Sequence, residues 1–154
     1  AFATFRNTHP QWKLVLVGTP GAGYAKINYA IHHHGVQAHV KMMGYRSDSE
    51  KYALLHAAHL LAIPSLAEGF GFPVLEGFAS KVPVLISRTP ALLEVAGDAA
   101  LSVDSDDPAA MAETLQRLAD DEPLRQRLIA KGHQRLADFS WEKAGKATWT
   151  VLHA

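Results

Sequence analysis

Short runs of apolar residues recur along the chain, and stretches richer in polar residues and alanine separate them. Four such runs stand out at intervals of roughly 20 to 25 residues: 13–17, 38–43, 60–63 and 82–86. A fifth, weaker run covers residues 99–103. Short, continuously apolar runs are typical of parallel strands buried on both faces. The pattern therefore predicts an α/β fold, a Rossmann-like doubly wound parallel sheet with the fifth run at its edge.

Signals for the starts of helices lie between and after these runs. Ser47 and Glu50 have the spacing of a capping box, in which each side chain bonds to the other residue's backbone amide. Pro108 follows two aspartates, a pattern typical of the first residue of a helix. A leucine stripe and a cap at Ser140 predict two further helices. We expect these three C-terminal helices to pack onto the sheet, and we expect packing roles for Trp12, Trp141 and Trp149.

Composition narrows the class of protein. The 154 residues fit one domain, and 48% of them are hydrophobic, which is enough for a core. Because 15 basic residues balance 15 acidic ones, we expect no nucleic-acid partner. The absence of cysteine excludes disulfides and thiolate metal sites. No run approaches the ~18 apolar residues of a membrane span, and we expect a cytoplasmic location. Residues 1–6 resemble the end of a helix, so we expect a fragment of a longer protein.

Glycines and polar residues gather in the segments that follow the predicted strands. These segments are residues 18–23, 44–46, 64–73 and 87–90. In an open parallel sheet, ligands bind beyond the carboxyl ends of the strands. We therefore expect the four segments to share one edge of the sheet and to line a cleft there.

The third of these segments carries the most chemistry. Gly69 and Gly71 allow a tight turn with free backbone amides, and Pro73 is placed where a helix begins. Such amides, together with the helix dipole, form an anion site. Glu68 precedes this turn, and Glu76 is expected in the first turn of the helix, so a carboxylate flanks each side of the anion. Carboxylates accept hydrogen bonds from sugar hydroxyls, and the arrangement therefore suits a nucleotide sugar.

Residues 68–76, with the sequence EGFGFPVLE, resemble the E-x7-E motif of the retaining glycosyltransferases of group 1 (family 4). Further segments resemble stretches of the same family in the same order: residues 14–18, 43–48, 82–87 with 93–98, and 139–142. That family has the GT-B fold, in which two Rossmann-like domains face each other. The resemblance implies that residues 1–154 are the C-terminal nucleotide-sugar-binding domain. It also implies that the acceptor domain and the first strand of this domain precede residue 1.

The resemblance also implies a role for each matching residue. Glu68 would contact the transferred sugar near the reacting carbon, as an orienting catalytic group, and Glu76 would accept hydrogen bonds from the ribose. The remaining donor-binding residues implied are Gly69, Phe70, Gly71, Phe72, Gly18, Tyr45 and Arg46. The reaction implied is sugar transfer, with retention, from a donor such as GDP-mannose or UDP-glucose to an acceptor hydroxyl. It uses no cofactor and needs no metal.

Several positions depart from the family pattern. Lys81 stands where the family usually has Gly, and Leu93 stands where it usually has Pro. Ala67 takes a position that often carries a larger side chain. The resemblance implies that the Arg/Lys pair that clamps the diphosphate would precede Ala1. The other half of the enzyme would also precede Ala1, and through that half the enzyme can associate peripherally with the inner face of the membrane. We therefore expect this fragment to bind its donor weakly and to be inactive alone.

Other readings remain open. A non-catalytic nucleotide-sugar-binding module and a nucleotide-sugar epimerase or phosphorylase-like transferase share the scaffold, but no acid/base set for an epimerase is identifiable. A dinucleotide-dependent oxidoreductase is disfavoured because the glycines of residues 18–23 have the spacing G-x-x-G-x-G. A metal site at residues 32–34, or at His56 and His59, is disfavoured because no carboxylate lies at ligand spacing.

Overall fold

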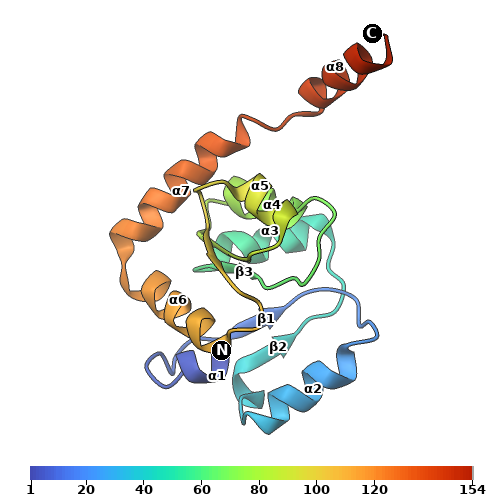
Figure 1. Cartoon of the computed structure of the whole chain (residues 1–154). Coiled ribbons are helices and arrows are strands. Elements are labelled where there is room, and N and C mark those ends of the chain that lie inside the picture. Colours follow the sequence, from blue (N-terminus) through green and yellow to red (C-terminus); the bar gives the residue numbers. More distant parts are fainter. Residues whose placement is uncertain (154) are drawn as a thin grey trace.

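Strands and helices alternate along residues 1–153, which the computed structural model describes (Figure 1). Residue 154, the last of the expected domain, lies outside the described residues. The strands are β1 (Leu14–Leu16), β2 (Val40–Met42), β3 (Leu61–Ile63), β4 (Val84–Ser87) and β5 (Leu101–Val103). The α-helices are α1 (Phe2–Phe5), α2 (Tyr24–His33), α3 (Asp48–Ala57), α4 (Phe72–Ala79), α5 (Pro90–Ala96), α6 (Pro108–Asp120), α7 (Glu122–Leu136) and α8 (Trp141–Leu152). A strand falls in each of the five apolar runs, and β4 extends one residue beyond its run, to Ser87, which confirms the predicted α/β alternation.

The strands form two parallel sheets rather than one. In the first sheet β1 pairs with β2, and in the second the order is β3-β4-β5, with β5 at the edge as predicted. These orders match positions 2-3 and 4-5-6 of the usual doubly wound sheet, whose order is 3-2-1-4-5-6. In residues 1–153 no strand lies between β1 and β3. The doubly wound sheet is therefore divided into two parts in these residues, and the absence of a first strand stays a prediction.

The alternation of backbone groups shows which edge of β1 is open. The Leu16 carbonyl accepts from the Met43 N–H at 2.9 Å, and the Gly18 N–H donates to the Gly44 carbonyl at 2.9 Å. Even-numbered residues of this strand therefore bond towards β2, and because the alternation has a period of two, the N–H and carbonyl of Val15 face the other way. That edge pairs with no strand in the described part of the chain.

The second sheet is covered on both faces. Val84 and Ile86 of β4 lie in a core cluster with apolar side chains of α4 and α5, whereas Leu85 lies in a second cluster with side chains of α1, α6 and α7. The second cluster contains the leucines that predicted α6 and α7: Leu115, Leu118, Leu124 and Leu128. This double cover confirms the doubly wound character, and it explains why all four residues of β4 are buried.

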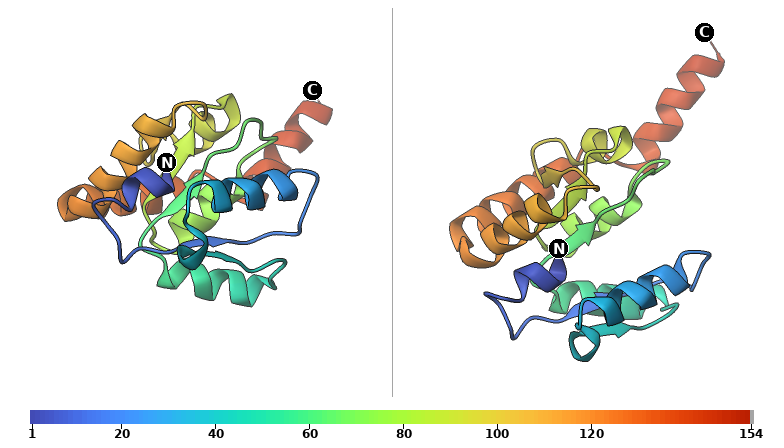
Figure 2. Two further views of the ribbon diagram at one scale, coloured as in Figure 1. Left: turned by 90° about the horizontal axis from the view of Figure 1, so that it is seen from below. Right: turned by 60° about the horizontal axis from the view of Figure 1, so that its bottom comes forward.

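The first sheet lies outside both core clusters. No residue of β1, β2 or α2 belongs to either cluster, and α2 buries none of its residues. The right-hand view of Figure 2 shows β1, α2 and β2 as a layer beside the second sheet and its helices. This part of the chain is therefore held less tightly than the second sheet.

The last helix departs from the expected packing. Ser140 caps α8 as predicted, since its Oγ accepts the Lys143 N–H at 3.1 Å. However, α8 buries none of its residues and projects away from the rest of the domain (Figures 1 and 2). Trp141 is 83% exposed and Trp149 is 65% exposed, so their predicted packing roles are wrong. Trp12 does pack, edge-on against Phe5 at 5.3 Å between ring centroids. The sequence pattern marks an apolar face on α8 but does not specify what covers it.

Lys81 is the one residue other than glycine with positive φ in residues 1–153, at 56°. It is exposed, and it lies in the turn between α4 and β4. We expect Lys81→Gly to raise the free energy of unfolding by about 0.5–1 kcal/mol. The reason is that relief of left-handed strain of ~1–2 kcal/mol exceeds the ~0.5–1 kcal/mol that glycine adds to the unfolded chain's entropy. Urea unfolding checks this, with Lys81→Ala as the control that should give no gain; an unchanged midpoint for Lys81→Gly would contradict it.

Candidate functional site

The turn between β3 and α4 is shaped by Gly71. Gly71 precedes α4 in the left-handed region, with φ of 109° and ψ of 39°. It is buried, and a Cβ atom there would lie 2.9 Å from Cδ2 of the buried Leu92 on α5. Both the backbone conformation and the close approach therefore require glycine. Pro73 follows as the second residue of α4, as predicted for a helix start. Glu76 is the fifth residue of α4, so its expected place in the first turn is wrong by one residue.

The free backbone amides of this turn indicate an anion-binding site. Within residues 1–153, the N–H groups of residues 69–72 have no hydrogen-bond acceptor. They come directly before the N-terminus of α4, where the helix dipole favours negative charge. The predicted set of amide donors is therefore free to bind a ligand.

Glu68 is held in place by a chain of two serine hydroxyls. The Ser65 Oγ donates to Glu68 Oε1 at 2.7 Å, and the Ser87 Oγ at the end of β4 donates to the Ser65 carbonyl. Ser87 is buried and Glu68 is only partly exposed. The carboxylate is thus fixed relative to the sheet. Sequence reasoning missed both serines, although each lies in a segment that follows a strand.

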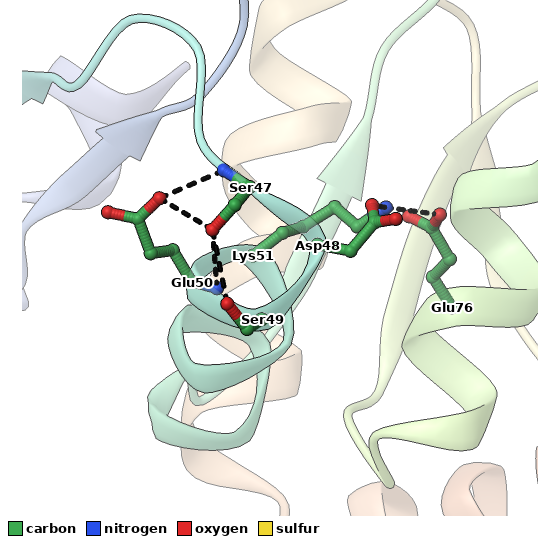
Figure 3. Close-up of polar contacts among 6 residues, drawn as sticks. All are labelled: Ser47, Asp48, Ser49, Glu50, Lys51 and Glu76. Atoms are coloured by element: carbon green, nitrogen blue, oxygen red, sulfur yellow. Dashed lines mark hydrogen bonds and ion pairs between the residues drawn. The ribbon is translucent and has the colours of Figure 1, made fainter.

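Glu76 is paired with a lysine from another helix. Lys51 Nζ on α3 donates to Glu76 Oε1 at 2.8 Å and to Asp48 Oδ1 at 3.0 Å (Figure 3). The side chains of Lys51 and Glu76 are 30% and 24% exposed, so the pair is partly buried. The hydrogen bond to Glu76, and then that to Asp48, raises the pKa of the Lys51 ammonium above its usual value. Lys51 therefore stays charged at neutral pH; sequence reasoning missed this residue.

The N-terminus of α3 is fixed by the predicted capping box. The Ser47 N–H donates to Glu50 Oε2 at 2.9 Å, and the Glu50 N–H donates to Ser47 Oγ at 3.4 Å (Figure 3). The Ser47 Oγ also donates to Glu50 Oε2 at 2.7 Å, and this bond, followed by that from the Ser47 N–H, lowers the pKa of the Glu50 carboxyl. Lys51 follows directly, so the cap sets the place from which Lys51 reaches α4.

The remaining predicted residues lie at the ends of β1 and β2 and around the turn. Tyr45 is 74% exposed, and Arg46 Nη1 donates to the Tyr45 carbonyl at 3.1 Å. Arg46 lines a small depression of about 280 Å³ with Met43, Glu50, Ala53 and Leu54. In the described residues, no hydrogen bond joins Gly18, Tyr45 or Arg46 to either glutamate. These three residues follow β1 and β2 of the first sheet.

The aromatic side chains of the turn are partly exposed. Phe70 is 40% exposed and Phe72 is 53% exposed, with 4.9 Å between their ring centroids. Phe70 also meets Phe139 edge-on, at 6.0 Å between centroids. Gly69 is exposed beside them. These rings form an apolar flank next to the free amides.

A depression of about 520 Å³ lies away from the glutamates. It follows the carboxyl ends of β4 and β5, and it is lined by Leu66, residues 87–90 and residues 104–107. Leu66 belongs to the β3–α4 segment, so the expectation that this segment and residues 87–90 share one edge is confirmed. The glutamates themselves do not line it. The free amides and the two hydrogen-bonded carboxylates lie instead at the turn.

Among residues 1–153, no three His, Asp or Glu side chains are grouped so that they could hold a metal ion. None of the helices described is long and apolar enough to cross a membrane.

The family model for group 1 glycosyl transferases matches residues 1–135. This chain belongs to the group 1 glycosyl transferases. It is 29% identical over 151 residues to a D-inositol 3-phosphate glycosyltransferase of Corynebacterium diphtheriae, covering 95% of the chain and 35% of that protein. It is 35% identical over 109 residues to O-antigen chain mannosyltransferase B of Escherichia coli, covering 71% of the chain and 29% of that protein. The chain thus spans about a third of the length of these relatives.

A solved structure of the same fold confirms the α/β architecture. A mutant of S. aureus TarM, in complex with fondaparinux, α-GlcNAc-glycerol and UDP, matches with a TM-score of 0.84 at 18% identity. The match covers 97% of this chain and 30% of that protein. At this identity the likeness shows the fold. The chain is therefore a Rossmann-like domain of a group 1 glycosyl transferase, and it corresponds to the C-terminal domain of their GT-B fold.

The requirement for glycine at position 71 can be tested. We expect Gly71→Ala to lower the free energy of unfolding by about 1–3 kcal/mol, through left-handed strain and the clash with Leu92. Gly69→Ala is the matched control, because a Cβ at residue 69 meets nothing within 4 Å, and its φ is not positive. Urea unfolding of both variants measures the two losses. Equal losses in the free energy of unfolding would contradict the requirement for glycine at residue 71.

Proposed function

We propose that this domain binds a nucleoside-diphosphate sugar for a retaining hexosyltransferase, and that the β3–α4 turn holds the donor. The observation that carries the proposal is the combination at this turn of free amides and two oriented carboxylates. The amides of residues 69–72 lack acceptors in the described chain, Ser65 orients Glu68, and Lys51 pairs with Glu76. The names of the relatives and the UDP bound to TarM support a nucleotide-sugar donor.

The diphosphate belongs at the amides. Backbone N–H groups at a helix N-terminus bind phosphate oxygens, and glycine lets the backbone approach them closely. During transfer the diphosphate leaves with growing negative charge, so the same donors stabilise the transition state electrostatically. This role needs no metal and no cofactor.

The two carboxylates bind the hydroxyls on either side of the diphosphate. Glu76 accepts hydrogen bonds from the ribose, and Glu68 accepts them from the transferred sugar near the reacting carbon. Glu68 then acts as an orienting group. Gly18, Tyr45 and Arg46 lie near the base or the phosphates, and Arg46 lines the depression beside α3.

The acceptor site lies outside this chain. The chain spans about a third of its relatives, so we assign the acceptor domain, the basic diphosphate clamp and any membrane association to the rest of the enzyme. Donors of the GDP-mannose and UDP-glucose types are the ones to try first. A non-catalytic binding module would not need Glu68 to be fixed by two serines, and that detail favours the enzyme.

Nucleotide titration tests the donor site. We expect one of UDP, GDP or ADP to shift the NMR signals of residues 68–76 at millimolar concentration, and we expect Glu76→Ala to weaken binding about tenfold through the lost ribose contacts. Glu94→Ala is the control, because Glu94 is exposed on α5 and no hydrogen bond of the described residues joins its side chain to the turn. Equal loss in both variants, or no shift with any nucleotide even when the basic segment is restored, would remove the site from this turn.

Turnover by the intact enzyme tests the role of Glu68. We expect Glu68→Gln to lower kcat by about 10- to 1000-fold, because an amide orients the sugar hydroxyls less well and gives less charge stabilisation. Nucleotide affinity should hold, since the nucleotide lies on the Glu76 side. Unchanged turnover would take Glu68 out of the mechanism.

A further inference from the structure

Lys51 connects two parts of the chain that share few other polar contacts. Among the described residues, its hydrogen bond to Glu76 is the one side-chain hydrogen bond that joins residues 13–58 to residues 60–153. It crosses from α3, next to the first sheet, to α4, which packs on the second (Figure 3). The bond engages the carboxylate that we assign to the ribose, so it bears on how the donor is bound.

The bond engages one carboxylate oxygen and leaves the other available. Lys51 donates to Oε1 of Glu76, and in residues 1–153 Oε2 of Glu76 has no hydrogen-bond donor. A carboxylate has about four lone-pair positions, so Oε2 and the remaining position on Oε1 can accept from a vicinal diol. A free glutamate loses rotamer freedom when it binds such a diol, and prior orientation removes that loss from the binding step.

Lys51 is itself restrained from several sides. Asp48 accepts from its Nζ at 3.0 Å, and the ammonium lies 5.3 Å from the ring centroid of Tyr52. The Ser47–Glu50 capping box fixes the turn of helix immediately before it. The capped end of α3 therefore positions Lys51, and Lys51 in turn orients the Glu76 carboxylate. A long side chain that formed only a surface ion pair would not need this support.

We propose that Lys51 is a positioning residue that sets the Glu76 carboxylate for the ribose diol of the donor nucleotide. This inference rests on the donor site proposed above, and it adds a residue from outside the turn. Lys51 does not touch the ribose. It acts by holding Oε1, so its removal lowers the preference for a nucleotide that carries both ribose hydroxyls.

The alternative is a purely structural link between α3 and α4. Such a link would affect all nucleotides equally, because it would change only the stability of the domain or the placing of α3. Partly exposed ion pairs contribute little to stability. The two roles therefore differ in ribose selectivity, which is the quantity to measure.

Calorimetry on the chain with paired nucleotides separates the roles. The probes are UDP with 2′,3′-dideoxy-UDP and GDP with 2′,3′-dideoxy-GDP, and the variants are Lys51→Met and Lys51→Arg. Lys131→Met is the control, since Lys131 Nζ forms an ion pair with Asp98 at 2.5 Å, more exposed than the Lys51–Glu76 pair and away from the site. We expect the wild type and the control to bind the ribose form about tenfold more tightly than the dideoxy form. Lys51→Met should reduce this ratio to within about twofold, and Lys51→Arg should restore most of it.

Each other result has a definite meaning. If the wild type binds neither UDP nor GDP at millimolar concentration, even when the basic segment is restored, the donor site fails and the inference fails with it. If the wild type binds but does not prefer the ribose form, the role of Glu76 fails. If the preference persists in Lys51→Met, or if both forms weaken equally, the donor site stands and Lys51 is only a structural link.

Discussion

Burial of β4 is the constraint on which the rest of the domain depends. Its side chains enter both core clusters in alternation, so neither face of the second sheet can shift without disturbing the other. At the end of the strand, the buried Ser87 hydroxyl holds the Ser65 carbonyl, and Ser65 in turn holds Glu68. Two hydrogen bonds thus fix the position of the Glu68 carboxylate relative to a buried apolar strand. In the proposed donor site, this carboxylate would be an orienting group whose position is set by the core.

Local patterns in the sequence were enough for the parts of the structure that local forces decide. The strand runs, the capping box at Ser47, the helix start at Pro108 and the cap at Ser140 are all confirmed, because each depends on residues within one turn or one strand. The placing of Glu76 missed by one residue, since α4 begins at Phe72 rather than at Pro73. Helix ends commonly shift by that much.

Contacts between distant residues could not be predicted from the same patterns. Ser87 and Ser65 are 22 residues apart, and Lys51 and Glu76 are 25 apart, so no local spacing relates them. The exposure of α8 could not be predicted for the same reason, because an apolar face predicts a packing partner without specifying which residues supply it. The separation of the two sheets also depends on tertiary pairing, because a strand of three residues carries no signal for its neighbour.

The open edge of β1 has a consequence for how ligand energy is used. The first sheet is held outside the core, so its hydrogen bonds can open and close without unfolding the second sheet. A nucleotide that touches both parts must therefore order the first one as it binds, and some of its interaction energy goes into that ordering. Contacts around Gly18 and Arg46 would then raise specificity for the base more than they raise affinity. An unpaired strand edge is also a surface on which two copies can pair, so concentrated solutions of the isolated domain are the conditions under which it would self-associate.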